Sequence, residues 1–129
     1  QDVAKKKKPK KGKRGDIFTI KCRYEISNEH SFEVHSQGEM GPEIERKSHL
    51  AYQVARFEAV AMGFPVQYRQ VVVEFYYHGR LDGSSGTLAT AVGLLALFTG
   101  VEISPRFAIT GSLDVFGWPP YCCLFSVSG

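Results

Sequence analysis

The chain has 129 residues, of which 43% are hydrophobic and 22% are charged, and its formal net charge is +3. This length fits one domain with a modest core, and no apolar run approaches the roughly 20 residues that a membrane-spanning helix needs. Three cysteines without a C-x-x-C spacing argue against a disulfide scaffold and against a zinc site. We therefore expect no metal, no cofactor and no membrane, and an intracellular, reducing compartment, with cytoplasm and mitochondrial matrix as alternatives.

Residues 1–14 are rich in lysine. The chain has 16 basic and 13 acidic residues, and 8 of the basic residues but only 1 of the acidic residues fall in this block. Residues 16–129 therefore carry 8 basic and 12 acidic residues, a net charge of −4. Such a block buries too little apolar surface to offset the entropy of ordering it, so we predict a disordered basic tail or linker. We favour a linker; the alternative is a weak, salt-sensitive contact with nucleic acid through Lys5, Lys6, Lys7, Lys8, Lys10, Lys11, Lys13 and Arg14.

Two short segments after this tail alternate apolar and polar residues. Residues 18–24 and 31–37 both have the period of two that half-buried strands show. Ser27 and Asn28 are suited to a turn between them. We predict that the two strands pair as a hairpin.

A helix is predicted over residues 43–62. Leu50, Val54, Phe57 and Ala61 recur at spacings of three and four, which predicts that they share its buried face.

The second half of the chain predicts a strand, a buried helix and further strands. Residues 71–77 are β-branched or aromatic except for Glu74, residues 87–98 are apolar on nearly all sides, and Thr99-Gly100 is suited to cap that helix. Short strands are expected at 107–110 and 113–116, and another after Pro119-Pro120. A strand, helix and strand in this order predict a βαβ unit with parallel strands. The fold class is therefore α+β: a small mixed β-sheet with a βαβ unit and two packed helices.

The loop before the second helix is the segment most suited to chemistry. It presents Ser84 and Ser85 where the unpaired amides and the dipole of a helix N-terminus favour negative charge. Those amides could bind an oxyanion that forms beside a nucleophilic serine. On the residues alone, small residues that precede a helix are more often simple caps.

The same segment resembles the proteolytic domain of Lon-family serine peptidases. That family has Asp-Gly-Pro-Ser-Ala-Gly before an alanine-rich helix that ends in Thr-Gly. This chain has Asp82-Gly83-Ser84-Ser85-Gly86-Thr87, and Thr99-Gly100 lies at the same distance without a gap. The family's Ala-Met-Thr-Gly corresponds to residues 108–111, and archaeal-type members continue with Ser-Leu, as residues 112–113 do.

The resemblance implies a Lon-like proteolytic domain over residues 15–117, with the fold of the second domain of ribosomal protein S5. It implies that Ser85 is the nucleophile position and that the backbone amides of Ser85 and Gly86 bind the oxyanion. The supporting residues would be Asp82, Gly83, Ser84 and Thr110. The implied partners are an unfolded polypeptide substrate, an ATPase module in cis or trans, and further copies in a homo-hexamer. ATP would act only through that module, because this chain has no Walker motif.

The sequence departs from the family at the general base. Lon peptidases pair the serine with a lysine, and the family register continued from Ser85 reaches Ser128 at that position. The last lysine is Lys47, and residues 118–129 form a divergent C-terminal segment. We therefore expect a C-terminally incomplete serine endopeptidase domain with little or no activity. The alternative is a non-catalytic S5-like interaction module whose basic tail contacts nucleic acid.

Two further residues near Ser85 have alternative interpretations. His78 is the nearest histidine in sequence, and a Ser–His pair is conceivable, although we favour a solvated loop histidine. Asp82 could orient a base, and it could equally form a turn or precede a helix.

Overall fold

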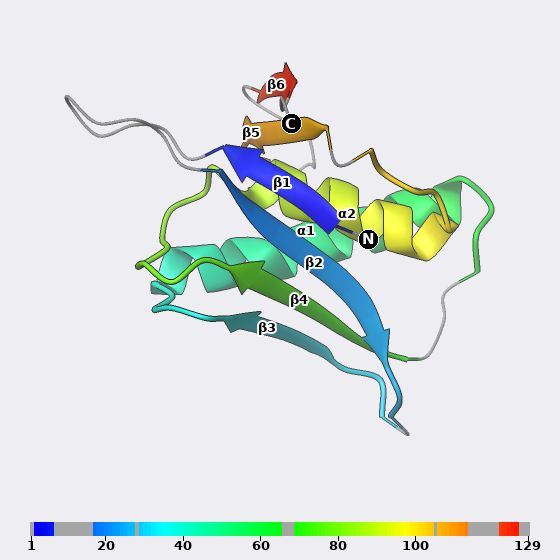
Figure 1. The fold of residues 1–129 in the computed structure, drawn as a ribbon. Coiled ribbons are helices and arrows are strands. Elements are labelled where there is room, and N and C mark those ends of the chain that lie inside the picture. Colours follow the sequence, from blue (N-terminus) through cyan, green and yellow to red (C-terminus); the bar gives the residue numbers. More distant parts are fainter. Residues whose placement is uncertain are drawn as a thin grey trace.

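The computed structural model describes residues 2–6, 17–27, 29–65, 69–104, 106–113 and 122–126. Within these residues it contains a mixed sheet of six strands and two helices (Figure 1). The α+β class predicted from the sequence is therefore confirmed. In chain order the elements are β1 (Asp2–Lys6), β2 (Ile17–Glu25), β3 (Phe32–Ser36), α1 (Pro42–Ala61), β4 (Gln70–Tyr76), α2 (Thr87–Thr99), β5 (Phe107–Gly111) and β6 (Cys122–Ser126).

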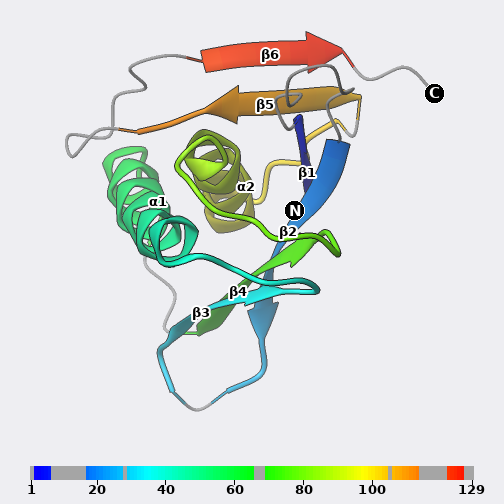
Figure 2. The ribbon, with the colours of Figure 1, turned by 90° about the vertical axis from the view of Figure 1, so that its left-hand side faces the viewer.

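The strand order in the sheet is β3-β4-β2-β1-β5-β6. β2 is antiparallel to both β1 and β4, β3 is parallel to β4, β1 is parallel to β5, and β5 is antiparallel to β6. The sheet curves, so that β5 and β6 lie on one side of the helix pair and β3 and β4 on the other (Figure 2). The curvature wraps the sheet around α2, which contacts β1, β2 and β5 as well as α1.

The predicted hairpin of the first two strands is wrong. β2 and β3 both form, but β4 lies between them and pairs with each. Its run Val71–Val73 is fully buried and Phe75 is too, as expected of a strand with neighbours on both sides. β3 therefore lies at the sheet edge, and α1 connects it to the parallel strand β4 as a second βαβ unit.

The βαβ unit predicted around the second helix is confirmed in its order and direction. β4 and β5 run parallel, because β4 and β1 are both antiparallel to β2, and β1 is parallel to β5. Two strands separate β4 from β5 in the sheet. Of the later strands, β6 confirms the one expected after Pro119-Pro120. The strand expected at 113–116 falls largely outside the described residues.

The buried face of α1 matches the predicted one only in part, because Leu50 and Val54 are half-buried against the core, whereas the other two predicted residues are not. Ile44, Ser48, Ala51, Ala55 and Ala59 are buried at spacings of four, three, four and four. Phe57, predicted to be buried, is 73% exposed, and Ala61 is exposed as well. Small side chains dominate the true interface because α1 packs closely against α2, which is itself rich in alanine. The prediction placed the large apolar side chains on the buried face, whereas two closely packed helices have small residues at their interface.

α2 and the sheet form the centre of the hydrophobic core. Leu94 and Ala89 of α2 are fully buried, together with Ile20, Val73 and Phe75 of the sheet. Gly100 ends α2 in the left-handed conformation with φ +73°, which confirms the predicted cap. Within the described residues, neither helix is long and apolar enough to cross a membrane.

The prediction of a disordered tail is wrong for residues 2–6. These residues form β1, which pairs with β2 over five register positions and with β5 at Ala4. Composition predicted disorder because lysines bury little apolar surface. Backbone hydrogen bonds to two neighbouring strands do not depend on that surface, and they offset the ordering entropy. Residues 7–14, which carry most of the predicted basic tail, lie outside the described residues, as do 118–121 and 127–129.

Candidate functional site around Ser85

The loop between β4 and α2 is held against the segment that precedes α1. The backbone amide of Leu81 donates to the carbonyl of Glu39 at 2.9 Å, and the amide of Gly41 donates to the carbonyl of Leu81 at 2.8 Å. Met40 and Leu81 form an isolated parallel bridge, and Leu81 is buried. The loop that carries the two serines therefore begins from a fixed position.

The side chain of Asp82 caps α1. Its Oδ1 atom accepts hydrogen bonds from the backbone amides of Glu43 at 3.2 Å and Ile44 at 3.3 Å. The first residue before α1 is Gly41, which offers no side-chain cap of its own. A hydrogen bond from the amide of Gly83 is the main reason that the pKa of Asp82 is lowered, and the amides of α1 and nearby Arg80 lower it further. The sequence analysis gave two interpretations of Asp82, as a residue that orients a base or as one that forms a turn or precedes a helix. The structure supports a role at a helix start, but the helix that Asp82 caps is α1 and not the following helix α2.

The next residues turn the chain into α2. Gly83 has φ +87°, a conformation that favours glycine. The carbonyl of Ser84 accepts hydrogen bonds from the amide of Thr87 at 3.1 Å and from its hydroxyl at 2.7 Å. Gly86 is the N-cap, and its carbonyl accepts from the amide and hydroxyl of Thr90. Two buried threonine hydroxyls thus fix the first turn of the helix.

Ser85 lies half-buried at the start of this turn, and its backbone joins α2 to β5. Its carbonyl oxygen accepts a hydrogen bond from the amide of Gly111 at 2.9 Å and a longer one from the hydroxyl of Thr110 at 3.4 Å. Thr110 is 4% exposed. The structure therefore brings together Ser85 and Thr110, which the sequence analysis assigned to one site. Asp82 instead caps α1.

The position of Ser85 favours binding of an anion, which is one of the two requirements of a nucleophilic serine site. A hydroxyl at the N-terminus of a helix of 13 residues lies in a region of positive potential. That potential stabilises an anion near the amides of Ser85 and Gly86. Nucleophilic attack also needs a base within hydrogen-bond reach.

Several of the lysine and histidine side chains that the structure describes contact other groups. The Lys21 ammonium lies 4.9 Å from the centroid of the Tyr76 ring, and Lys47 lines a surface hollow on α1 with Arg46 and His49. His30 Nε2 is 3.0 Å from the Tyr52 hydroxyl, and His35 Nε2 is 2.9 Å from a Glu33 carboxylate oxygen. His78 is exposed in the loop after β4, as the sequence analysis favoured.

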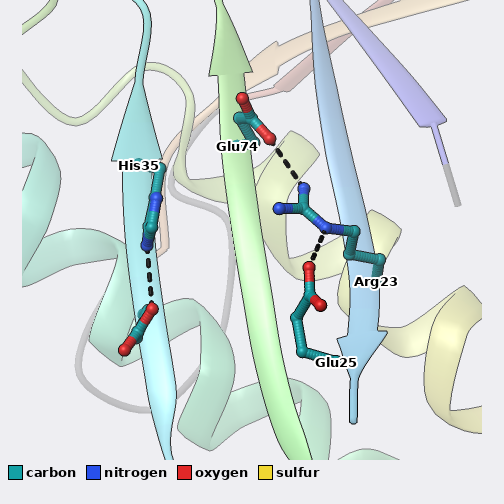
Figure 3. A network of polar contacts seen from close by, with 5 residues as sticks. Arg23, Glu25, His35 and Glu74 are labelled. Atoms are coloured by element: carbon teal, nitrogen blue, oxygen red, sulfur yellow. Dashed lines mark hydrogen bonds and ion pairs between the residues drawn. The ribbon is translucent and has the colours of Figure 1, made fainter.

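A second polar cluster lies on the sheet face turned away from the helices (Figure 3). Arg23 of β2 donates to Glu25 at 2.6 Å and to Glu74 of β4 at 2.7 Å. The hydrogen bond with Glu25, and then that with Glu74, raises the pKa of the guanidinium. Because the side chains of Arg23 and Glu25 are each about two-fifths exposed, the cluster is a surface ion-pair network that links two strands.

The sequence analysis missed the cap that Asp82 gives to α1. A signal existed, since Gly41 and Pro42 begin a helix without a capping side chain, and another residue has to satisfy its amides. In the described part of the chain, no group of three or more acidic, histidine or cysteine side chains is arranged to hold a metal ion. A scan against models of protein families gives no match to this chain. A search of curated proteins gives no significant relative either.

Proposed function

We propose that this chain is a module of the Lon proteolytic lineage, with the S5 domain 2-like fold over residues 15–117 and Ser85 at the nucleophile position. The observation that carries the proposal is the contact of Ser85 with Thr110 and Gly111. In the family, the corresponding two segments carry the nucleophile and a threonine that supports the dyad. The order of a strand from Ile17, a helix, and a strand before the serine loop also agrees with the resemblance.

The module has little or no peptidase activity in our proposal. The support is the family register, which, continued from Ser85, places Ser128 where the family has its lysine, and no lysine follows Lys47 in the 129 residues. Without a base, a serine hydroxyl is a poor nucleophile at neutral pH. In a complete assembly, the module would meet unfolded polypeptides delivered by an ATPase in cis or trans, as a homo-hexamer.

A cleavage assay tests the activity. Fluorescently labelled casein is incubated with the wild-type chain and with Ser85→Ala, and we expect no release of fluorescence from either. Cleavage by the wild type that Ser85→Ala abolishes would contradict the proposed inactivity and would support Ser85 as nucleophile. The lineage itself is tested by superposing an experimental structure on a Lon proteolytic domain. Failure of α2 and β5 to superpose together would refute it.

A non-catalytic module that contacts nucleic acid is the second candidate. The observation that favours it is β1, which places Lys5 and Lys6 in a strand paired with β2. Polyanion binding through lysines releases counterions and weakens steeply with salt. Substituting Lys7, Lys8, Lys10 and Lys11 by glutamine should reduce both the affinity for a labelled RNA and its salt dependence. Binding that ignores salt or these four residues would exclude this candidate.

A further inference from the structure

The outer face of α1 carries large apolar side chains that are open to solvent. α1 lies at one side of the molecule, with α2 and the sheet on its inner side (Figure 2). On the outer face, Phe57 is 73% exposed and Val60 is 51% exposed, and the half-buried Leu50 precedes Phe57 by two turns. Large apolar side chains that are exposed together are typical of surfaces that bind other proteins.

An open hollow lies on the same face, one turn before Phe57. It is lined by Arg46, Lys47, His49, Leu50 and Gln53. Four of these, at positions 46, 49, 50 and 53, have the spacing i, i+3, i+4 and i+7, so they surround one point on the helix surface. In a helix pair, such a hole receives one side chain, the knob, from the facing helix. The outer face of α1 therefore suits a second helix as its partner.

Phe57 is a knob that fits this hollow. It is the most exposed large apolar side chain of α1. The hollow is open and has a volume of about 460 Å³, so an aromatic ring can enter it without displacing a neighbour. A knob and a hole on one face make that face complementary to itself. When two copies of α1 lie antiparallel about a two-fold axis, Phe57 of each enters the hollow of the other. The axis then passes beside Gln53, midway between Phe57 and the centre of the hollow.

The charges of α1 agree with pairing to a second copy. Three acidic and three basic side chains balance along the helix, which favours a partner without a strong net charge: Glu43, Glu45, Glu58, Arg46, Lys47 and Arg56. In the described part of the chain, no ion pair involves Lys47 or Glu58. They are 11 positions apart, about 16 Å along one helix, so they cannot pair within a chain. Antiparallel pairing about Gln53 brings Lys47 of each copy opposite Glu58 of the other.

We propose that α1 is a self-association surface, which pairs antiparallel with α1 of a second copy of this chain. Phe57, Leu50 and Val60 supply most of the affinity, and the two Lys47–Glu58 pairs fix the register. A contact with two-fold symmetry joins two copies, whereas a ring uses different surfaces on the two sides of each contact. The pairing is therefore separate from the proposed hexamer and does not depend on the proposed function.

Sedimentation equilibrium of the full chain tests the pairing. We expect the mass to rise with concentration from 14.4 kDa to twice that value. Phe57→Asp should weaken the dimer about thirtyfold or more, because it removes the apolar side chain at the centre of the contact. Val101→Asp is the matched control at an exposed apolar residue outside α1, and it should leave the mass unchanged. A monomeric wild type at the highest concentration, or equal effects of the two substitutions, would overturn the proposal.

An exchange of charges tests the register. Lys47→Glu and Glu58→Lys each place like charges opposite one another at two symmetric positions, so each should weaken the dimer about tenfold. The double variant restores opposite charges and should recover the wild-type affinity. Because the two residues are too far apart to meet within one chain, this recovery requires contact between copies. Circular dichroism checks that each variant is folded. Single variants without effect, or a double variant that does not recover, would refute the antiparallel pairing.

Crosslinking locates the two-fold axis and separates this contact from a ring. Gln53→Cys should crosslink between copies with a short bifunctional maleimide, above the background that the native cysteines give in the wild type. Glu45→Cys should not, because about 25 Å of helix would separate it from its symmetry mate. Equal crosslinking of the two variants would contradict the position of the axis. A hexamer that Phe57→Asp leaves intact would support the proposed assembly and overturn the pairing of α1.

Discussion

The side chain of Asp82 caps helix α1 from 38 residues away, because its Oδ1 atom accepts a hydrogen bond from the amide of Ile44 at 3.3 Å. The residue that begins the serine loop thus satisfies an amide at the start of the other helix. This relationship couples the conformation of the loop before α2 to the position of α1.

Substitution of Asp82 should destabilise the fold in a way that depends on pH. Asp82→Ala removes the cap, whereas Asp82→Asn keeps an oxygen acceptor and should cost less. The pKa of the carboxylate is lowered in the folded chain, mainly by the amide of Gly83. The stability that the charge contributes is therefore fully present above about pH 4, the ordinary value for aspartate, and is lost as pH falls through the lowered folded value.

Urea denaturation between neutral pH and pH 3 measures this effect. The difference in the free energy of unfolding between wild type and Asp82→Asn should shrink below about pH 4. A difference that stays constant over this range would show that the charge of Asp82 does not act on α1.

Gly41 should be coupled to Asp82. A Cβ atom built on Gly41 would overlap the Asp82 carboxylate, so Gly41→Ala should displace the cap. The substitution should therefore cost clearly less in an Asp82→Ala background than in the wild type. Gly83→Ala is the matched comparison, because open space surrounds its Cβ position and only its φ of +87° is unfavourable. It should cost about 1–2 kcal/mol in both backgrounds, and equal behaviour of the two glycines would contradict the overlap.

Thr110→Val should loosen the connection between Ser85 and β5. The buried hydroxyl of Thr110 donates to the Ser85 carbonyl at 3.4 Å, so its loss should lower the free energy of unfolding by about 0.5–1.5 kcal/mol. Hydrogen exchange at the Gly111 amide, which donates to the same carbonyl, should become faster. Thr110→Ser keeps the hydroxyl and should preserve the protection of that amide. Faster exchange in Thr110→Ser together with unchanged exchange in Thr110→Val would point to packing of the methyl group instead.

Leu94→Ala tests the position of the core. Leu94 of α2 is fully buried in the hydrophobic core, and its truncation should cost about 2–5 kcal/mol. Val101→Ala, at an exposed residue just beyond the same helix, should stay within about 0.5 kcal/mol of the wild type. Chemical denaturation of both variants measures the difference, and similar losses would contradict the assigned burial.

Local patterns predicted the elements well and their pairing poorly. The apolar segment at 87–98 and the β-branched segment at 71–77 formed α2 and β4 nearly as expected, because each has one dominant local preference. The pairing of β4 between β2 and β3 joins residues that are 45 to 57 positions apart in β2 and β4 and 39 apart in β3 and β4, and no local signal in these strands predicts it. The two strands that are neighbours in sequence, β2 and β3, were predicted to pair with each other. The buried residues of β4 instead need a neighbouring strand on each side, and β2 and β3 fill these two positions.

The candidate site shows the same division. Thr110 and Ser85 are in contact, and the resemblance to the Lon family places both in one site, but their role in that site stays a prediction. The cap of α1 by Asp82 depends on two distant loops meeting, and only the uncapped start of α1 hinted at it. Likewise, the exposure of Phe57 could not be predicted from helical spacing. The spacing shows which residues share a face of the helix, but it does not show which face a second helix covers.

β1 is the one link in the described sheet between β2 and β5. Shortening the chain at its amino end would therefore divide one sheet into two smaller ones. Each would gain a bare edge of unsatisfied backbone groups, which are prone to join with other chains. A protein trimmed to remove a supposed tail would be expected to precipitate, and that outcome would say nothing about the basic residues themselves.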